Sequence, residues 1–278
     1  MRLAARIEGV GLVGPGLQGW TESRAILAGN APYESRPTVI PAPEALPAVE
    51  RRRAGKCVRI SLAAGLAAAA DAGREARDLA AIFTSSTGDG ENLHAICETL
   101  ASDDRLISPT RFHNSVHNAP AGYWGIATGA MKPSDCLAAF DASFGAGLVE
   151  AMGRLAADPS LPVLLIAYDA PYPEPLHAVR PVPDCFGVGL VLVAAELAAA
   201  PIVAPEAAIA AIVRGPSISL ATTQESPTTL PSPLLESLRR SIPAARSLPL
   251  LCLLARNEPG RVVVEYLDDL SLAIEVSR

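Results

Sequence analysis

Residues 111–143 read RFHNSVHNAPAGYWGIATGAMKPSDCLAAFDAS, and this stretch says most about the fold. A polar, helix-forming segment leads through a Gly/Pro turn to a short apolar strand at Cys136–Phe140 and then a sharp turn into an Ala/Gly-rich helix. A strand, a tight turn and a helix N-terminus are a common mount for a nucleophile, because N–H groups at the helix start stabilise anions and developing oxyanions. We expect the turn to project Asp141, which Ala142 and Ser143 follow.

The composition indicates a chain that buries a large core and does not bind nucleic acid. Half of the 278 residues are hydrophobic, 19% are charged and 4% are aromatic, so aliphatic side chains must build the core. The net charge is −6 without a basic stripe, which argues against nucleic-acid or anionic-membrane binding. Arg51–Arg53 are a short basic run, either a solvated helix face or a contact for an acidic partner. No domain-sized change in composition occurs, which predicts a single domain over residues 1–278.

The sequence also predicts a cytoplasmic protein without a membrane segment. The first residues lead directly into an alternating strand pattern, so no secretory signal is expected. The longest apolar runs contain charges, Gly or Pro and are too short to span a bilayer. Five scattered cysteines without a CxxC spacing favour reduced thiols over disulfides or zinc.

Apolar strands alternate with helical segments along the chain. Because the strands are apolar throughout, both faces of the sheet must be covered, and the pattern predicts an α/β fold: a layered mixed sheet with helices on both faces. The expected strands are Arg6–Gly14, Leu79–Ser85, Pro162–Tyr168, Phe186–Ala195, Ala211–Arg214, Leu248–Ala255, Arg261–Tyr266 and Leu272–Val276. The expected helices are Trp20–Ala28 with Thr21 as N-cap, Val58–Arg77, Glu91–Ser102, Phe144–Ala157 and Pro233–Ser241. Prolines make 32–47 an irregular excursion and 201–210 a linker, and Gly145 and Gly147 indicate close backbone approach.

Two motifs resemble parts of a metal or cofactor site, but neither is accompanied by the other residues that such a site needs. His113 and His117 lie four residues apart and would share a helix face, but no HExxH motif or carboxylate cluster accompanies them, so polar lining of a cleft or a subunit contact is expected. Gly88-Asp89-Gly90 follows a strand and precedes a helix, but Leu93 stands where a dinucleotide-binding loop needs its third glycine. We therefore predict turn glycines, no metal and no cofactor.

Asp141 and Ser143 are the candidates for chemistry at the turn. A serine nucleophile needs a base held by a third group, and only His113 and His117 are neighbours in the sequence. The alternative for Ser143 is a hydrogen bond in the first helical turn, and an Asp at a helix start stabilises it by about 1 kcal/mol without catalysis. A carboxylate here would repel the oxyanion that a thiolate site stabilises, which argues against a condensing reaction.

The segment before the turn resembles the N-x-x-A-G…I…G…P pattern that precedes the nucleophilic cysteine of β-ketoacyl synthases, here NAPAG at 118–122 with Ile126, Gly129 and Pro133. Residues 180–192, RPVPDCFGVGLVL, resemble a second stretch of that family. Counting onward from Pro133 places Asp141 at the cysteine position. The resemblance covers about residues 3–197 and implies the N-terminal half of the thiolase-like fold. A short divergent tail replaces the second half and its two catalytic histidines.

Short cysteine-less relatives with FHNSVHNAPAGYW-like segments resemble the chain-length-factor-like subunits of aryl polyene and xanthomonadin-type pigment synthases. This resemblance implies a non-condensing subunit that pairs with a full-length ketosynthase and meets acyl carrier protein through that complex. It also implies that Ser134–Phe140 pairs across the dimer and that Arg111–His117 reaches toward the partner's acyl tunnel. The interface and tunnel residues expected are Arg111, His113, Ser115, Val116, His117, Asn118, Tyr123, Trp124, Leu137 and Phe140.

Two other functions stay open at this point. One is an acyl-ACP or acyl-CoA hydrolase or decarboxylase that uses Ser143 or Asp141. The other is a homodimeric acyl-binding module without a ketosynthase partner.

Overall fold

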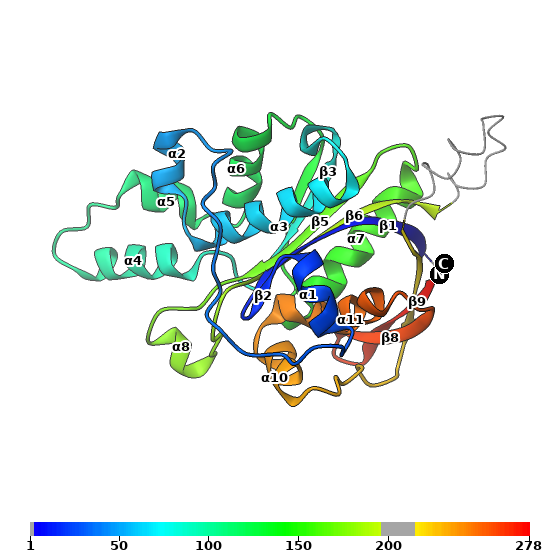
Figure 1. The fold of residues 1–278 in the computed structure, drawn as a ribbon. Coiled ribbons are helices and arrows are strands. Elements are labelled where there is room, and N and C mark those ends of the chain that lie inside the picture. Colours follow the sequence, from blue (N-terminus) through cyan, green and yellow to red (C-terminus); the bar gives the residue numbers. More distant parts are fainter. Residues whose placement is uncertain (1–2, 196–214) are drawn as a thin grey trace.

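A computed structural model describes residues 3–195 and 215–278. Its strands are β1 (Leu3–Gly14), β2 (Leu17–Gln18), β3 (Ala80–Thr84), β4 (Ser134–Leu137), β5 (Val163–Asp169), β6 (Phe186–Ala194), β7 (Ser217–Thr223), β8 (Gly260–Leu267) and β9 (Leu270–Ser277). They form one nine-stranded sheet in the order β4-β3-β5-β6-β1-β7-β9-β8, with β2 beside β1 (Figure 1). The expected linker at 201–210 and strand at 211–214 lie outside the described residues.

The sheet is mixed. Strand β3 is parallel to both β4 and β5, whereas the remaining neighbours pair antiparallel. The helices are α1 (Trp20–Leu27), α2 (Ala48–Arg53), α3 (Lys56–Ala72), α4 (Gly90–Ala101), α5 (Pro109–Ser115), α6 (Ala119–Thr128), α7 (Ser143–Ala157), α8 (Leu176–Val179), α10 (Pro233–Ser241) and α11 (Leu248–Arg256). The 3₁₀ helices in the described part of the chain are η1 (Ala76–Asp78), η2 (Phe140–Ala142) and η4 (Pro243–Ser247).

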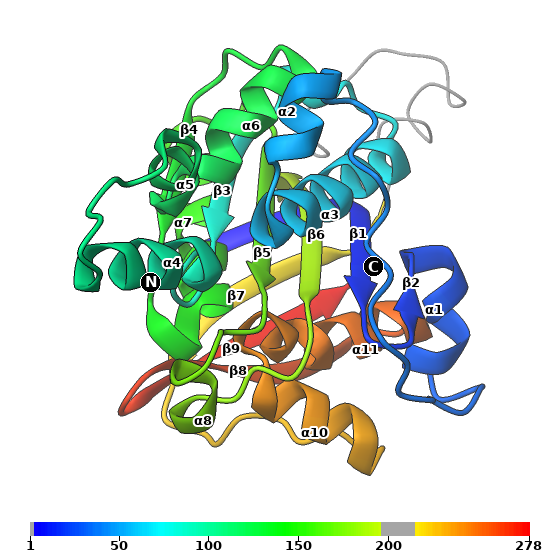
Figure 2. The same ribbon diagram turned by 90° about the vertical axis from the view of Figure 1, so that its left-hand side faces the viewer.

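Helices cover both faces of this sheet, as the apolar strands predict. Helix α3 packs across β1, β5 and β6 on one face, where α6 joins it, and α7 packs on the other face against β1, β3, β5 and β6 (Figure 2). Two apolar clusters result, one around α7 and α11 and the other around α3 and α6. None of the described helices combines the length and apolar character needed to cross a bilayer.

Glycines let the helices approach the sheet closely. A Cβ atom at Gly11 of β1 would lie 2.0 Å from the Ala64 carbonyl oxygen of α3, and one at Gly189 of β6 would lie 2.5 Å from the same atom. On the other face, a Cβ at Gly145 of α7 would lie 2.5 Å from the Glu265 carbonyl oxygen. The close backbone approach expected for the glycines of α7 is confirmed at Gly145, whereas Gly147 makes room for the side chains of Leu165 and Thr84.

One predicted strand is wrong: residues 248–255 form helix α11 and not a strand. The cause is burial, because every residue from Leu248 to Ala255 is buried. A helix that is apolar on all sides has no hydrophobic periodicity, so its sequence cannot be told from that of a buried strand.

Several predicted boundaries also shift. Gly19, not Thr21, is the N-cap of α1, and no side chain caps that helix. Helix α3 ends at Ala72, well before Arg77, because Gly73 adopts a left-handed φ of 65°. The strand expected to reach Phe140 ends at Leu137. The turn that follows the strand also differs from the expected one, in the residue that it projects.

Candidate functional site

The elbow turn, residues 139–143, joins β4 to α7. Phe140 has a φ of 51°, and among the described residues only Asn257 is another non-glycine residue with positive φ. The Phe140 side chain is 57% exposed. A left-handed φ at a non-glycine residue is unfavourable and is held by surrounding contacts. The residue that the strained turn projects is therefore Phe140, one position before the expected Asp141.

Ser143 closes the elbow turn from inside. Its side chain is buried. The hydroxyl donates to the Phe140 carbonyl oxygen at 2.7 Å and accepts from the Ala139 N–H at 3.1 Å. No described histidine hydrogen-bonds to it. The hydroxyl thus makes a hydrogen bond in the first helical turn, the alternative to catalysis given above. None of the described side chains acts as a base that would activate it as a nucleophile.

Two arginines bind Asp141. Arg180, just after α8, donates to Oδ1 at 2.6 Å, and Arg246 of η4 donates to Oδ2 at 3.0 Å. Burial alone would lower the pKa of Arg180, but hydrogen bonds to Tyr172 and Asp141 raise it. The Asp141 carboxylate therefore lies between two fixed cations.

The ion pairs continue away from the elbow turn. Arg246 also lies 3.6 Å from Glu265 of β8, which contacts Arg239 of α10 as well. Arg239 binds Glu236 at 2.7 Å, and this hydrogen bond is the main cause of its raised pKa. The sequence did not indicate these partners of Asp141, because Arg180 lies 39 residues and Arg246 105 residues away along the chain. Arg239 was missed as well, because it is linked to Asp141 only through Glu265 and Arg246.

A cleft of about 850 Å³ opens beside the elbow turn, between it and the β8–β9 hairpin. The turn contributes apolar atoms of Ala139, Phe140 and Ala142. The hairpin contributes both apolar and acidic side chains, Tyr266, Leu267, Asp268, Asp269 and Leu270. Asp141, Arg246 and Glu265 also line the cleft, so the ion pairs form part of its wall.

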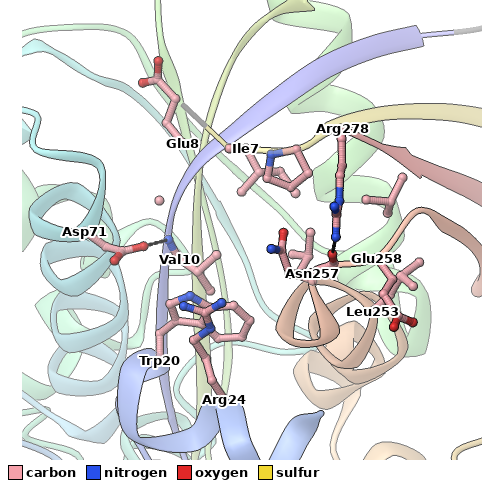
Figure 3. Close-up of a pocket in the computed structure, with 15 residues that line it drawn as sticks. Ile7, Glu8, Val10, Trp20, Arg24, Asp71, Leu253, Asn257, Glu258 and Arg278 are labelled. Atoms are coloured by element: carbon pink, nitrogen blue, oxygen red, sulfur yellow. Dashed lines mark hydrogen bonds between the residues drawn. The ribbon is translucent and has the colours of Figure 1, made fainter. Parts of the chain in front are cut away.

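A smaller cavity, about 230 Å³, lies elsewhere, among α1, α3, β1 and α11 (Figure 3). Asp71 on its wall accepts a hydrogen bond from the Val10 N–H at 2.8 Å, and Arg278 binds the Asn257 carbonyl oxygen. The Arg24 guanidinium lies 6.0 Å from the centre of the Trp20 ring. These groups already satisfy one another, and the residues expected at the elbow turn do not reach this cavity.

The two histidines do not form a common site. The ring of His113 packs edge-on against Tyr123, with 5.9 Å between centroids, whereas His117 lies beside Gly88. Nowhere in residues 3–195 and 215–278 do three His, Cys, Asp or Glu side chains converge on one possible metal position. Next to Gly88, the Asp89 carboxylate caps α4 by accepting from the Asn92 N–H at 3.0 Å, which fits turn glycines.

Tyr123 and Trp124 lie in the core, 1% and 2% exposed. The Tyr123 hydroxyl donates to Asn114, whose amide group donates to the Arg53 carbonyl oxygen at 2.8 Å and so ties α5 to α2. The expectation that these two aromatic side chains anchor an interface does not fit this placement.

The other expected interface residues lie on or near the surface. Two nearby apolar side chains that the sequence did not single out are strongly exposed, Phe112 at 61% and Met131 at 94%. Arg111, His113, Val116 and Asn118 are exposed too, and Ser115, His117 and Leu137 are half-buried. Helices α4 and α5 lie side by side and project from the sheet (Figure 1). Strand β4 is an edge of the sheet, paired in the described structure only with β3.

No thiol lies at the elbow turn. All five cysteines are free, and Cys97 is the exposed one. Burial raises the pKa of Cys136, Cys185 and Cys252 to about 11 each. A reactive cysteine needs a lowered pKa, so these three lack the character of a nucleophile.

Comparison with known proteins assigns the family. Residues 20–233 match the beta-ketoacyl synthase N-terminal domain, beyond residue 197 where the resemblance in the sequence stops. No curated protein matches the sequence. One similar solved chain belongs to a ketosynthase (ApeO) in complex with its chain length factor (ApeC) from Xenorhabdus doucetiae: 24% identity, TM-score 0.69, covering 99% of this chain and 100% of that chain.

Two further solved structures share the fold at lower identity. The ishigamide ketosynthase/chain length factor has 14% identity and a TM-score of 0.66, covering 99% of both chains. AntDE:AntF, a type II PKS acyl-carrier protein in complex with its ketosynthase, has 9% identity and a TM-score of 0.73, covering 100% of this chain and 99% of that chain. These likenesses show a thiolase-like ketosynthase fold, and with the sequence match over residues 20–233 the chain belongs to the beta-ketoacyl synthase N-terminal domain family.

Proposed function

We propose that this protein is a non-condensing, chain-length-factor-like subunit. The observation that carries the proposal is the elbow turn. It bears no thiol, its strained position holds Phe140, and its carboxylate is bound by Arg180 and Arg246. Without a nucleophile and a base, the turn cannot perform acyl transfer. The same contacts argue against a hydrolase or decarboxylase that uses Ser143 or Asp141, because both side chains are already engaged.

The partner in this proposal is a full-length ketosynthase, in an aryl polyene pathway in the cytoplasm. Three observations support pairing through one surface: the free edge of β4, the exposed Phe112 on α5 and the exposed Met131 just before β4. An edge strand offers unpaired N–H and C=O groups to a second chain, and exposed apolar side chains add area to bury. Ser115 and Val116 at the end of α5 would then face the partner's acyl tunnel.

Acyl carrier protein would meet this subunit through the complex. Arg51–Arg53 on α2 are exposed, and within the described residues Arg53 alone of the three pairs with a carboxylate, that of Glu50 at 3.2 Å. These side chains provide a contact for an acidic partner.

Co-expression with the ketosynthase encoded beside this gene tests the proposal. We expect the two chains to co-purify, and we expect product formation to require the cysteine of the partner alone. Val116→Trp should shorten the product, whereas the exposed Val39→Trp, on the irregular segment before α2, should not. Condensing or hydrolytic activity of the isolated chain, or unchanged products without it, would contradict the proposed function.

A further inference from the structure

The carboxylate of Asp141 is bound in the way that an arginine site binds an anionic ligand. Each of its oxygens is taken by a different guanidinium, Oδ1 by Arg180 at 2.6 Å and Oδ2 by Arg246 at 3.0 Å. The arginines come from separate parts of the chain, the loop after α8 and η4, so the fold brings them together. Guanidinium groups bind carboxylates and phosphates through such charge-assisted hydrogen bonds.

Arg180 is held in place by contacts other than Asp141. Its guanidinium lies 3.5 Å from the centre of the Phe140 ring, over the ring face. Tyr172 is a second polar neighbour that helps to raise the pKa of Arg180. The attraction of the guanidinium to the ring face therefore acts on Arg180 in addition to its bond to Asp141.

Arg246 is also held independently, because Glu265 lies 3.6 Å from it and Arg239 in turn fixes Glu265. In addition, the Nε atoms of Arg180 and Arg246 are buried and hydrogen-bond to nothing in the described structure. The donor capacity of the two guanidinium groups therefore exceeds what one carboxylate uses.

We infer that Arg180 and Arg246 form an anion-binding site and that Asp141 is its built-in occupant. The site takes a carboxylate or a phosphate group, and it opens into the 850 Å³ cleft that Arg246 and Asp141 line. In the intact chain the tethered carboxylate has a high effective concentration, so a free anion does not displace it. The contact closes the site to anionic ligands.

Removal of the occupant tests this inference in the full-length chain. Asp141→Ala leaves both arginines and creates room for an anion. We expect acetate or inorganic phosphate, compared with chloride at equal ionic strength, to raise the Tm of this variant saturably by roughly 3 °C or more. Wild type should show no saturable rise. Asp141→Ser, a second variant of small volume, gives the same test if the alanine variant does not fold.

Two matched controls separate a built site from a general salt effect. Glu225→Ala removes the carboxylate from a different ion pair, in which Glu225 lies 2.6 Å from Arg261 and both side chains are exposed. It should not gain the response, and adding Arg180→Gln to Asp141→Ala should abolish it. A rise with acetate alone assigns a carboxylate site, and a rise with phosphate alone assigns a phosphate site. An equal rise in Glu225→Ala, persistence in the double variant, or no rise in either Asp141 variant overturns the inference.

Discussion

Ser143 shows how one hydroxyl can fix a strained turn. It bonds the backbone on both sides of Phe140, accepting from Ala139 and donating to the Phe140 carbonyl. A buried donor or acceptor without a partner destabilises the folded state, because it has given up hydrogen bonds to water and gained none in the protein. The side chain therefore contributes to the fold of the turn and not to a reaction.

We predict that Ser143→Ala lowers the free energy of unfolding by about 1–2 kcal/mol, because the part-buried Ala139 N–H loses its acceptor and the Phe140 carbonyl keeps only the Ser143 backbone N–H as a donor. Urea unfolding measures the change. Ser160→Ala is the control, since its hydroxyl bonds only to exposed Asp158, and it should change stability by less than about 0.5 kcal/mol. Equal effects of the two substitutions would contradict the role of Ser143 in closing the turn.

Asp169 is a buried carboxylate at the end of β5 that joins two distant segments. Oδ1 accepts from the Ser86 N–H at 2.9 Å, and Oδ2 accepts from the Ala244 N–H at 2.8 Å. Burial raises its pKa above the ordinary 3.8, although the hydrogen bonds from Ser86, Ala244 and Ser85 act in the opposite direction. The folded state therefore binds this proton more tightly than the unfolded chain does.

This pKa direction gives a pH prediction. Because the folded-state pKa is raised, the stability contributed by protonated Asp169 is present below about pH 3.8 and is lost as pH rises through the raised pKa. Asp169→Asn removes the titration. We expect the free energy of unfolding of wild type minus that of the variant to decrease from about pH 4 upward, measured by urea unfolding. A difference that is constant or increases with pH would show that burial does not dominate.

At the scale of elements, β4 has one paired edge and one edge without a partner strand among the described residues. The Pro133 and Leu137 carbonyl oxygens accept from Ala81 and Ser85 on the β3 side. Because strand groups alternate in direction, the N–H groups of Ser134 and Cys136 face away from β3. A second chain that extends the sheet would use those groups.

We predict that Ser134→Pro disrupts pairing with the ketosynthase, because proline removes one outward N–H without breaking a bond to β3. Ser134→Thr keeps that group and is the matched control. This site is preferable to Leu137, whose side chain packs against the core of the chain itself. Pull-down from co-expressed cells measures the effect, and equal recovery of the Pro and Thr variants would place the interface elsewhere.

The elements differ in how far sequence predicts them. Strands such as β5 and β6 are short apolar runs between polar residues, so their type could be read locally. Helix α11 could not, since burial on all sides removes its periodicity. The elbow turn was located from the sequence, but its strained residue and its arginine partners depend on contacts made across the fold.

At the scale of the whole molecule, three of the five thiols lie in the core. Cys57 of α3 and Cys185, just before β6, are buried in the apolar cluster around α3 and α6, and Cys252 is buried in α11. Burial raises the pKa of Cys57 well above its usual range. Thiolate formation, and therefore alkylation, is suppressed at such sites.

We predict that only Cys97 reacts rapidly with a thiol reagent in the native protein, and that all five cysteines react in denaturant. Mass spectrometry after timed labelling measures this, with Cys97→Ser as the control that should stay unlabelled. The ketosynthase inhibitor cerulenin should not label the chain. Stoichiometric labelling by cerulenin would show a reactive thiol and contradict the non-condensing role.

The central position of β1 determines the order in which the protein can assemble during synthesis. Strand β1 pairs with β6, where Ala5 meets Ala194, and with β7, where Ala5 meets Ile218. Its partners therefore emerge roughly two hundred residues later, and closing such long loops is slow. Strands β3, β4 and β5 lie closer in sequence and can associate first. Until β6 and β7 have been synthesised, β2 is the only described strand that can pair with β1, and the unpaired length of β1 is open to aggregation.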